Sequence, residues 1–394
     1  MAAEEGVPPS SAGLGAAEPE AAAGIGASPE AASCSAADFV RFGISIEGLE
    51  LFVRRHAGRL EPTSTTSDVC HTLIKPATAA PGWVDEVELV AGPDPRQRLY
   101  RHRSRELATG SVAEEPPPGS RSYCELMLGD AETAHMVGKP TVFFSHAWSF
   151  PFSNVVAALR AFADTTESPV FFWFDCFSLD EHATQLLPAD FWSTTFQAAV
   201  AQIGHTVMML SPWHAPVPLT RAWCLWELFA THRAGAKFEI VLGPDEQRAF
   251  EAAILDDFDV IFSAFVGIDV AKSQTGQESD RLRIIAAVQR SIGCSALNAL
   301  ALEQLRQWIF ATAAKVASAP GAAPALQSQV AKLFMRFRRF SEAEPLCRAA
   351  LATQTEALGR SHVATLQLKM ELANLLRKRA WPQVHTPSHV SIYP

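Results

Sequence analysis

The sequence predicts an α/β fold, with a parallel sheet and flanking helices, followed by a short all-α segment near the C-terminal end. Three observations lead to this prediction. Between residues 138 and 313, short apolar runs alternate with segments whose apolar residues recur at helical spacing. Residues 325–381 show helical spacing alone and contain a repeat. A stretch rich in proline, alanine and glycine, residues 317–324, separates the two regions.

The N-terminal third of the chain has no sustained apolar period. Residues 1–37 are mostly alanine, glutamate, proline and glycine, and their few apolar side chains cannot offset the entropy of ordering, so this tail is predicted to be disordered. Residues 38–137 begin with apolar positions such as Phe39 and Ile44, but repeated prolines interrupt them. We expect an irregular segment of short helices and loops that packs on the next domain. For residues 85–120 a disordered linker is the alternative.

The central region carries the signals of a parallel sheet. Three apolar runs, at 141–145, 170–175 and 206–211, predict buried strands, and the segments 154–162 and 191–203 between them predict helices. Such alternation implies right-handed crossovers with helices on both faces. A predicted helix at 223–232 then leads to a fourth strand at 238–242. Helices at 245–264 and 281–313 follow, with a short strand near 266–270.

The C-terminal segment contains an internal repeat. Residues 330–334, V-A-K-L-F, reappear as L-A-N-L-L at 372–376, an offset of 42 residues because 372 minus 330 is 42. With Ala343, Ala350 and Gly359 between the two copies, the pattern resembles the tetratricopeptide repeat of kinesin light chains. The resemblance implies paired helices over 325–381 that hold a protein partner. Residues 382–394 depart from the pattern and predict an irregular tail.

Composition excludes several classes of protein. Lys plus Arg is 33 and Asp plus Glu is 42, for a net charge of -9, and no basic block is present, so nucleic acid is not an expected partner. No run of 18 apolar residues occurs, which excludes a predicted membrane span. The seven cysteines are scattered without a C-x-x-C pair, and no signal peptide is recognisable, so we expect a cytoplasmic protein without disulfides.

Two motifs in the central region resemble the TIR (Toll/interleukin-receptor) family, especially its plant type. Residues 143–146 read F-F-S-H, like the first strand of that family, and residues 223–228 read W-C-L-W-E-L, like the W-C-L-x-E-L that opens a central helix. The resemblance covers residues 142–231 and implies a flavodoxin-like sheet. The loop that begins at Asp175 and the region beyond Ala234 depart from the family pattern.

The resemblance implies a chemistry for Glu227. In TIR domains that cleave NAD, the acidic residue of this helix is the catalytic glutamate, and a carboxylate near the ribose can stabilise an oxocarbenium-like state. NAD would then be a substrate, with no cofactor required. Family sites are assembled between subunits, which implies a homo-oligomer. The alternative is that Glu227 is only a first-turn acid favoured by the helix dipole. Catalysis predicts that Trp223 and Leu228 are buried while Glu227 faces a cleft.

Other polar residues follow the predicted strands. Ser145, His146 and Trp148 come after the first strand and Asp175 ends the second, so they lie at the carboxyl edge where open α/β sheets bind ligands. Together with Trp223 they are the candidate NAD-binding residues. For His146 the alternative is a buried imidazole that donates to a backbone carbonyl.

Three readings of function follow. The favoured one is an intracellular signalling or scaffold protein, whose TIR-like domain and repeats bind proteins and which also cleaves NAD. The second is an NAD glycohydrolase that uses Glu227. The third is a metal-assisted nucleotide-binding hydrolase, in which oxygens of Asp175 and its neighbours hold a divalent cation. The neighbours in question are Asp180, Glu181, His182 and Asp190.

Overall fold

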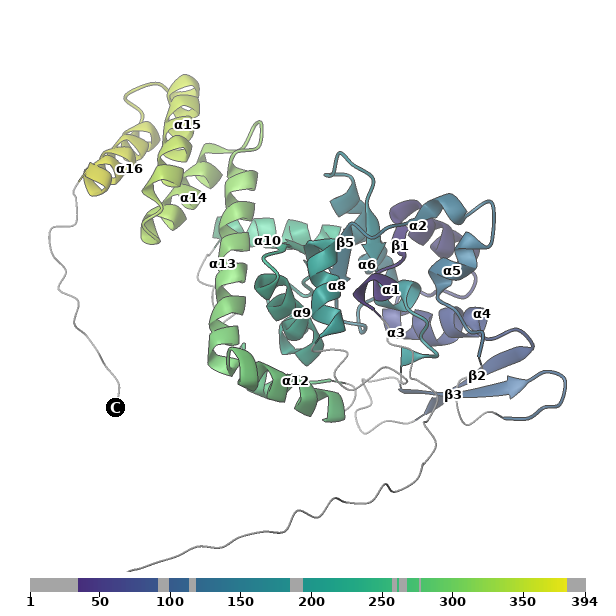
Figure 1. Ribbon diagram of the computed structural model, residues 1–394. Coiled ribbons are helices and arrows are strands. Elements are labelled where there is room, and N and C mark those ends of the chain that lie inside the picture. The colour runs from purple at the N-terminus through teal and green to yellow at the C-terminus, as the bar shows by residue number, and fades with distance from the viewer. Residues whose placement is uncertain are drawn as a thin grey trace, which may run out of the picture. The chain divides into compact units, whose positions relative to one another are not determined.

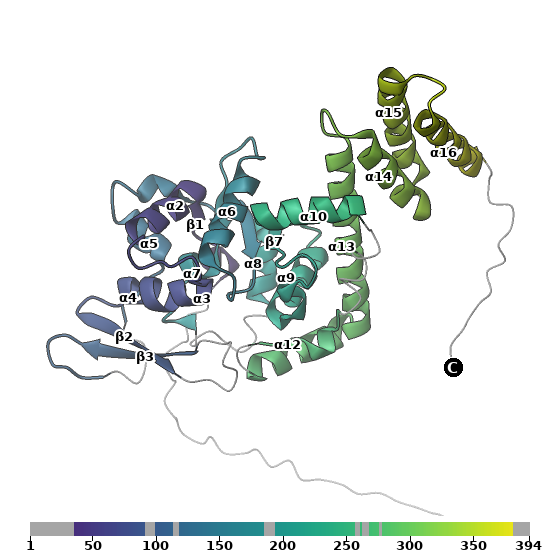
Figure 2. The same cartoon turned by 180° about the vertical axis from the view of Figure 1, so that it is seen from behind.

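The computed structural model describes residues 35–90, 99–112, 118–184, 194–256, 261, 268–275 and 278–380 (Figures 1 and 2). The predicted tail is thus outside the described residues up to Cys34, and so are residues 381–394. The last residues of the predicted tail are helical or cap a helix, because Ser35 and Asp38 form a capping box at the start of α1 (Ala36–Phe39).

A six-stranded sheet forms the centre of the fold, in the order β4-β1-β6-β5-β7-β8. Four strands run parallel: β5 (Val142–Ser145), β6 (Phe171–Trp173), β7 (His205–Met209) and β8 (Lys237–Val241). These are the four strands predicted from the apolar runs, within a few residues at each end. The second strand ends earlier than predicted, since Asp175 begins the short helix α7 (Asp175–Ser178).

The predicted parallel sheet is present but only mostly parallel, and the prediction of only helices and loops in residues 38–137 is wrong. This segment adds β1 (Gly43–Ser45) and β4 (Val137–Gly138), and β1 pairs antiparallel with both β4 and β6. A Cβ on Gly43 would lie 3.0 Å from the carbonyl oxygen of Phe172, so the glycine permits the close approach of the two strands. Strands of two and three residues are too short to show an alternating pattern.

The same segment forms a separate two-stranded hairpin, which replaces both the loops and the disordered linker proposed for this stretch. Strands β2 (Trp83–Val90) and β3 (Leu99–Glu106) pair antiparallel over eight residues. The signal for β3 was present, because arginine recurs at every second position, 101, 103 and 105. The opposite face carries Tyr100, His102 and Ser104 instead of an apolar row, so the alternation does not have the apolar face that identifies a half-buried strand.

Helices cover both faces of the sheet, as predicted. On one face, Phe144 of β5 belongs to a core shared with α2 (Ile46–Arg55) and α6 (Phe152–Ala163). On the other face, the ring of Phe143 stacks on Trp173 at 4.8 Å and meets Phe196 of α8 (Thr195–Ile203) edge-on at 5.6 Å. Each buried phenylalanine contributes about 1.5–3 kcal/mol relative to an exposed one. The alternation along β5 therefore decides which side chains share a face.

The remaining helices follow in chain order. The smaller ones before the sheet's centre are α3 (Thr66–Val69), the π-helix η1 (Cys70–Ile74), α4 (Lys75–Thr78), α5 (Tyr123–Leu128) and η2 (Ala134–Met136). After β7 come η5 (Val217–Thr220), α9 (Ala222–Arg233), α10 (Pro244–Asp256), η6 (Val270–Lys272), α12 (Glu278–Ser291) and α13 (Cys294–Ala317). The short strand predicted near 266–270 is absent from its described residues, because 268 and 269 have no regular structure and Val270 begins η6.

The C-terminal segment is wholly helical in its described part, as predicted: α14 (Pro324–Arg336), α15 (Phe340–Leu358) and α16 (Val363–Ala380). Ala343 and Ala350 of α15 are fully buried, so the neighbouring helices approach closely, and Gly359 ends α15 with a φ of +87°. The ring of Phe310 on α13 meets Phe334 on α14 at 5.8 Å. The segment is thus continuous with the preceding helix through aromatic packing.

One membrane-related finding concerns the described helices. None of them alone is long and apolar enough to cross a bilayer, and α12 with α13 reach that length and composition only as a pair bent by 91°.

Candidate functional site

Glu227 and Ser145 meet at the carboxyl end of β5. Ser145 is the last residue of that strand and is fully buried, and its Oγ donates a hydrogen bond of 2.5 Å to Glu227 Oε2. Glu227 lies one turn into α9, a helix buried on most sides, and the hydroxyls of Thr231 and Thr206 at 2.8 Å fasten this helix to β7. Residues 82 positions apart are therefore brought together by the sheet, as the carboxyl-edge argument predicts.

The surroundings of Glu227 favour its neutral form. Burial raises the pKa of Glu227 from 4.5 to about 8; the Asp175 carboxylate also raises it, while the Ser145 hydroxyl and Arg221 act in the opposite direction. At pH 7 the ligand-free carboxyl is therefore mostly protonated. A bound cation close to it would favour the ionised form. Arg221, which immediately precedes α9, is a residue of this site that the sequence did not single out.

Asp175 and Trp148 form a second polar contact at the same edge. Trp148 Nε1 donates to Asp175 Oδ2 at 2.6 Å, and the backbone N–H of Cys176 donates to Asp175 Oδ1 at 2.8 Å. Burial raises the pKa of Asp175 to about 6, although both hydrogen bonds lower it. Because both carboxylate oxygens already accept hydrogen bonds, Asp175 fixes the orientation of the half-buried indole of Trp148.

The side chain of His146 lies on the opposite face from Glu227. Its ring stacks on Phe144 at 4.9 Å, and its Nε2 lies 3.1 Å from the hydroxyl of Thr66, not from the carbonyl oxygen proposed as the alternative. Burial, assisted by Arg221, lowers the pKa of His146 to about 3, so the ring is neutral. Side chains alternate between faces along a strand, which is why neighbours in sequence do not share a pocket here. His146 is a packed core residue.

Trp223 and Leu228 differ in burial. Leu228 is buried as expected, but Trp223 is only partly buried, so the prediction for Trp223 is wrong. Trp223 and Glu227 are four residues apart on α9 and therefore lie one above the other on the same side of the helix. Cys224, between them, is buried and its pKa is raised by burial, so it is an inert thiol.

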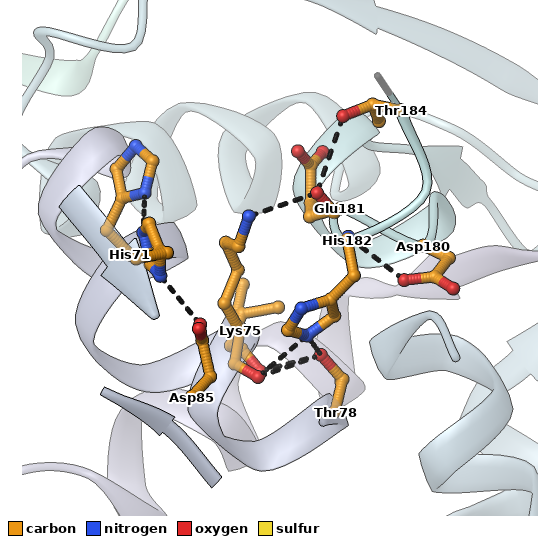
Figure 3. A network of polar contacts seen from close by, with 10 residues as sticks. His71, Lys75, Thr78, Asp85, Asp180, Glu181, His182 and Thr184 are labelled. Carbon is orange, nitrogen blue, oxygen red and sulfur yellow. Dashed lines mark hydrogen bonds and ion pairs between the residues drawn. The ribbon is translucent and has the colours of Figure 1, made fainter. Parts of the chain in front are cut away.

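The acidic loop after α7 is fastened to α4 (Figure 3). Lys75 Nζ donates to the carbonyl oxygen of Glu181 at 3.1 Å, and His182 Nε2 lies 3.0 Å from the carbonyl oxygen of Lys75. The N–H of His182 donates to Asp180 Oδ1 at 3.0 Å, and the Ser120 hydroxyl donates to Asp180 Oδ2 at 2.7 Å. These side chains thus hold the loop in place.

Only part of the predicted metal site lies in the described residues. Within the ranges that the structure describes, no group of three or more His, Cys, Asp or Glu side chains is arranged to hold a metal ion. Asp190, one of the five residues predicted to surround the cation, lies outside those ranges.

Comparison with known proteins does not assign the chain to a family. No protein-family model, no curated protein and no solved structure matches the chain. The interpretation of the site therefore depends on the contacts described above.

Proposed function

We propose that the chain cleaves the nicotinamide N-glycosidic bond of NAD, with Glu227 as the catalytic carboxylate of a TIR-like domain. The observation that carries this proposal is the 2.5 Å hydrogen bond between Ser145 and Glu227 at the carboxyl edge of the sheet. It places the one carboxylate of the W-C-L-W-E-L motif against the end of β5.

The order of the parallel strands supports a ligand site at this place. Numbered by appearance, β6-β5-β7-β8 reads 2-1-3-4, the order of flavodoxin-like sheets, and α6 and α8 lie on opposite faces. In such sheets ligands bind in the crevice at the carboxyl ends of the first and third strands, where the chain changes direction. Those strands are β5 and β7, and Ser145 ends the first of them.

The charge of the substrate suits the resting state of Glu227. The nicotinamide ring of NAD is a pyridinium cation, so its arrival would lower the raised pKa of Glu227 and release the carboxyl proton. The ionised carboxylate would then stabilise positive charge on the ribose as the C–N bond lengthens. Ser145 would hold the carboxylate, while Trp148, bonded to Asp175, and Trp223, four residues before Glu227 on α9, are partly exposed aromatic residues.

The test is nicotinamide release from NAD by the full chain, with Glu227→Gln as the variant. The matched control is Glu167→Gln, an exposed glutamate in the turn between α6 and β6. We expect release by the wild type and the control, and a loss of at least about 100-fold in Glu227→Gln, the scale of one preorganised electrostatic group. Release that persists in folded Glu227→Gln would contradict the assignment.

A second function, protein association, is favoured by the surface of α16. Val363, Leu366 and Met370 follow helical spacing and are 68%, 46% and 66% exposed, so they form an apolar stripe. An open, shallow depression on α15, lined in part by Leu351 and bordered by Leu372 of α16, lies in the same segment. Apolar stripes of this kind mark association surfaces.

We expect the full chain to self-associate through this stripe, in line with a tetratricopeptide-type segment. Sedimentation of the double variant Val363→Ser, Met370→Ser should then show a smaller mass than the wild type at equal concentration. Leu89→Ser is the control, because Leu89 is 60% exposed on the separate hairpin. An unchanged mass in the double variant would contradict self-association through α16.

A further inference from the structure

A chain of three polar side chains connects the β2–β3 hairpin to η1. Asp85 Oδ2 lies 2.6 Å from His102 Nδ1, and His102 Nε2 lies 2.7 Å from His71 Nδ1 (Figure 3). Asp85 and His102 come from the two strands of the hairpin, while His71 comes from η1. We call these three side chains the relay. It has no part in the contacts of Glu227 and Ser145 described above.

The positions of the protons in the relay follow from its geometry. With Asp85 ionised and the ring of His102 neutral, His102 Nδ1 donates to Asp85, and His102 Nε2 accepts a hydrogen bond from His71 Nδ1. His71 Nε2 is then left with a lone pair, and no partner for it exists among the described residues. Burial, followed by His102 and Lys75, lowers the pKa of His71 to about 4, so this ring is neutral at pH 7.

The buried carboxylate of Asp85, at the far end of the relay, is not fully hydrogen-bonded. Asp85 is only 4% exposed, and its Oδ1 has no hydrogen-bond partner within the part of the chain that the structure describes. An unpaired buried carboxylate oxygen is unfavourable, and a positive charge on the adjacent imidazole would compensate it. If a proton enters at His71 Nε2 and the Nδ1 proton moves on, His102 becomes the cation beside Asp85. A proton taken up at His71 Nε2 would therefore come to rest on His102, beside Asp85.

The open end of the relay lies beside the candidate site. The ring of His71 meets Trp148 edge-on, with centroids 6.2 Å apart, and Trp148 is the residue that Asp175 orients. The segment before His71 is also fastened to the loop that leaves Ser145, because the N–H of Ser67 donates to the carbonyl oxygen of Trp148 at 2.9 Å. The segment that carries His71 is thus hydrogen-bonded to the loop that follows Ser145.

We propose that His71 is the general base that activates the hydrolytic water, with His102 and Asp85 as its positioning residues. This role rests on the proposed cleavage of NAD. As the C–N bond breaks, its electron pair goes to the pyridine nitrogen, and nicotinamide leaves. The water oxygen bonds to C1′ of the ribose, and one water proton moves to His71 Nε2. The His71 Nδ1 proton passes to His102, and the proton gained is later released to solvent, so the products are ADP-ribose, nicotinamide and one proton.

The experiment separates bond cleavage from water activation. The full chain is incubated with NAD and labelled free nicotinamide, and both ADP-ribose formation and incorporation of label into NAD are measured. Exchange of the base needs C–N cleavage but no water. In His71→Gln we expect hydrolysis to fall about 100-fold, the scale of general base catalysis, while exchange continues. The control is His135→Gln, an exposed imidazole on η2, which should leave both reactions unchanged.

Two further variants test the relay independently of the glutamine substitution. His71→Ala should regain hydrolysis when free imidazole is added, which a loss of folding would not allow. Asp85→Asn should shift the acid limb of the pH profile for hydrolysis to lower pH, because it removes the negative charge that favours the protonated relay. The other charged groups that face His71 are Asp68, Lys75 and His102, and they are left unchanged.

Each remaining outcome overturns the proposal. Normal hydrolysis in His71→Gln would show that His71 activates no water. Equal loss of hydrolysis and exchange in a folded variant would assign His71 to substrate binding or to cleavage itself. A wild-type chain that performs neither reaction would contradict NAD cleavage at Glu227, and this role of His71 would be rejected with it.

Discussion

Replacing Glu227 by glutamine should stabilise the fold, increasingly so as the pH rises. Burial gives Glu227 a pKa of about 8 in the folded chain, against an ordinary value of 4.5. A carboxyl with a raised pKa stabilises the folded state fully below 4.5, and this contribution is lost as the pH rises toward 8, because unfolding then releases a proton. Glutamine has no proton to lose and can still accept the hydrogen bond from Ser145.

The magnitude follows from the difference in pH. Neutral pH lies 2.5 units above 4.5, and each unit is worth about 1.36 kcal/mol, so the upper value at pH 7 is about 3.4 kcal/mol. Glu227 keeps partial contact with solvent, which reduces this to about 2 kcal/mol. We therefore expect Glu227→Gln to exceed the wild type in free energy of unfolding by about 2 kcal/mol at pH 7 and by nothing measurable at pH 4.5.

Urea unfolding followed by tryptophan fluorescence is the assay, since seven of the nine tryptophans lie between residues 138 and 313. The free energy of unfolding is measured at pH 4.5, 6, 7 and 8 for the wild type, Glu227→Gln and the exposed control Glu167→Gln. A stability difference for Glu227→Gln that does not grow with pH would refute the reasoning. A difference that grows would show that the fold disfavours the ionised form of this carboxyl, a cost in stability that functional groups often carry.

Three other predictions test the fold around the site. Phe143→Ala should lower the free energy of unfolding by about 3–5 kcal/mol in urea, because the ring is almost fully buried; a loss under about 1 kcal/mol would contradict its place in the core. Trp148→Leu removes a donor to Asp175 and should raise the pKa of Asp175 above about 6 in an NMR titration. Gly359→Ala, at a φ of +87°, should destabilise the helical segment by about 1 kcal/mol in thermal melts, whereas Gly58→Ala, with open space around it, should not.

Part of the fold could be predicted from the sequence because its signals are local. The strands at 142–145 and 205–209 each contain a run of apolar residues. Helix α9 begins directly after the loop that starts at Pro212. By contrast, β1 has three residues and β4 has two, which is too short for a repeated alternation of side chains to be recognised. Short strands are formed by their partners in the sheet and not by their own pattern.

The residues of the candidate site also differ in whether the sequence could predict their contacts. Ser145 and Glu227 could be paired from the sequence because both sit next to recognisable motifs at one edge of the sheet. The contact between His71 of η1 and His102 of the hairpin joins residues 31 positions apart in different elements, so no periodic pattern points to it. His146 was expected beside Ser145, but a strand turns successive side chains to opposite faces.

The place of β1 in the sheet has a practical consequence for any shortened form of this protein. A chain that begins near residue 138 would retain the motifs yet lack the strand that pairs with both β4 and β6. The outer edge of β6, with the buried Phe172, would then be left unpaired, and unpaired apolar edges recruit strands from other molecules. Aggregation of such a fragment would result from the missing strand and would not test whether the domain cleaves NAD.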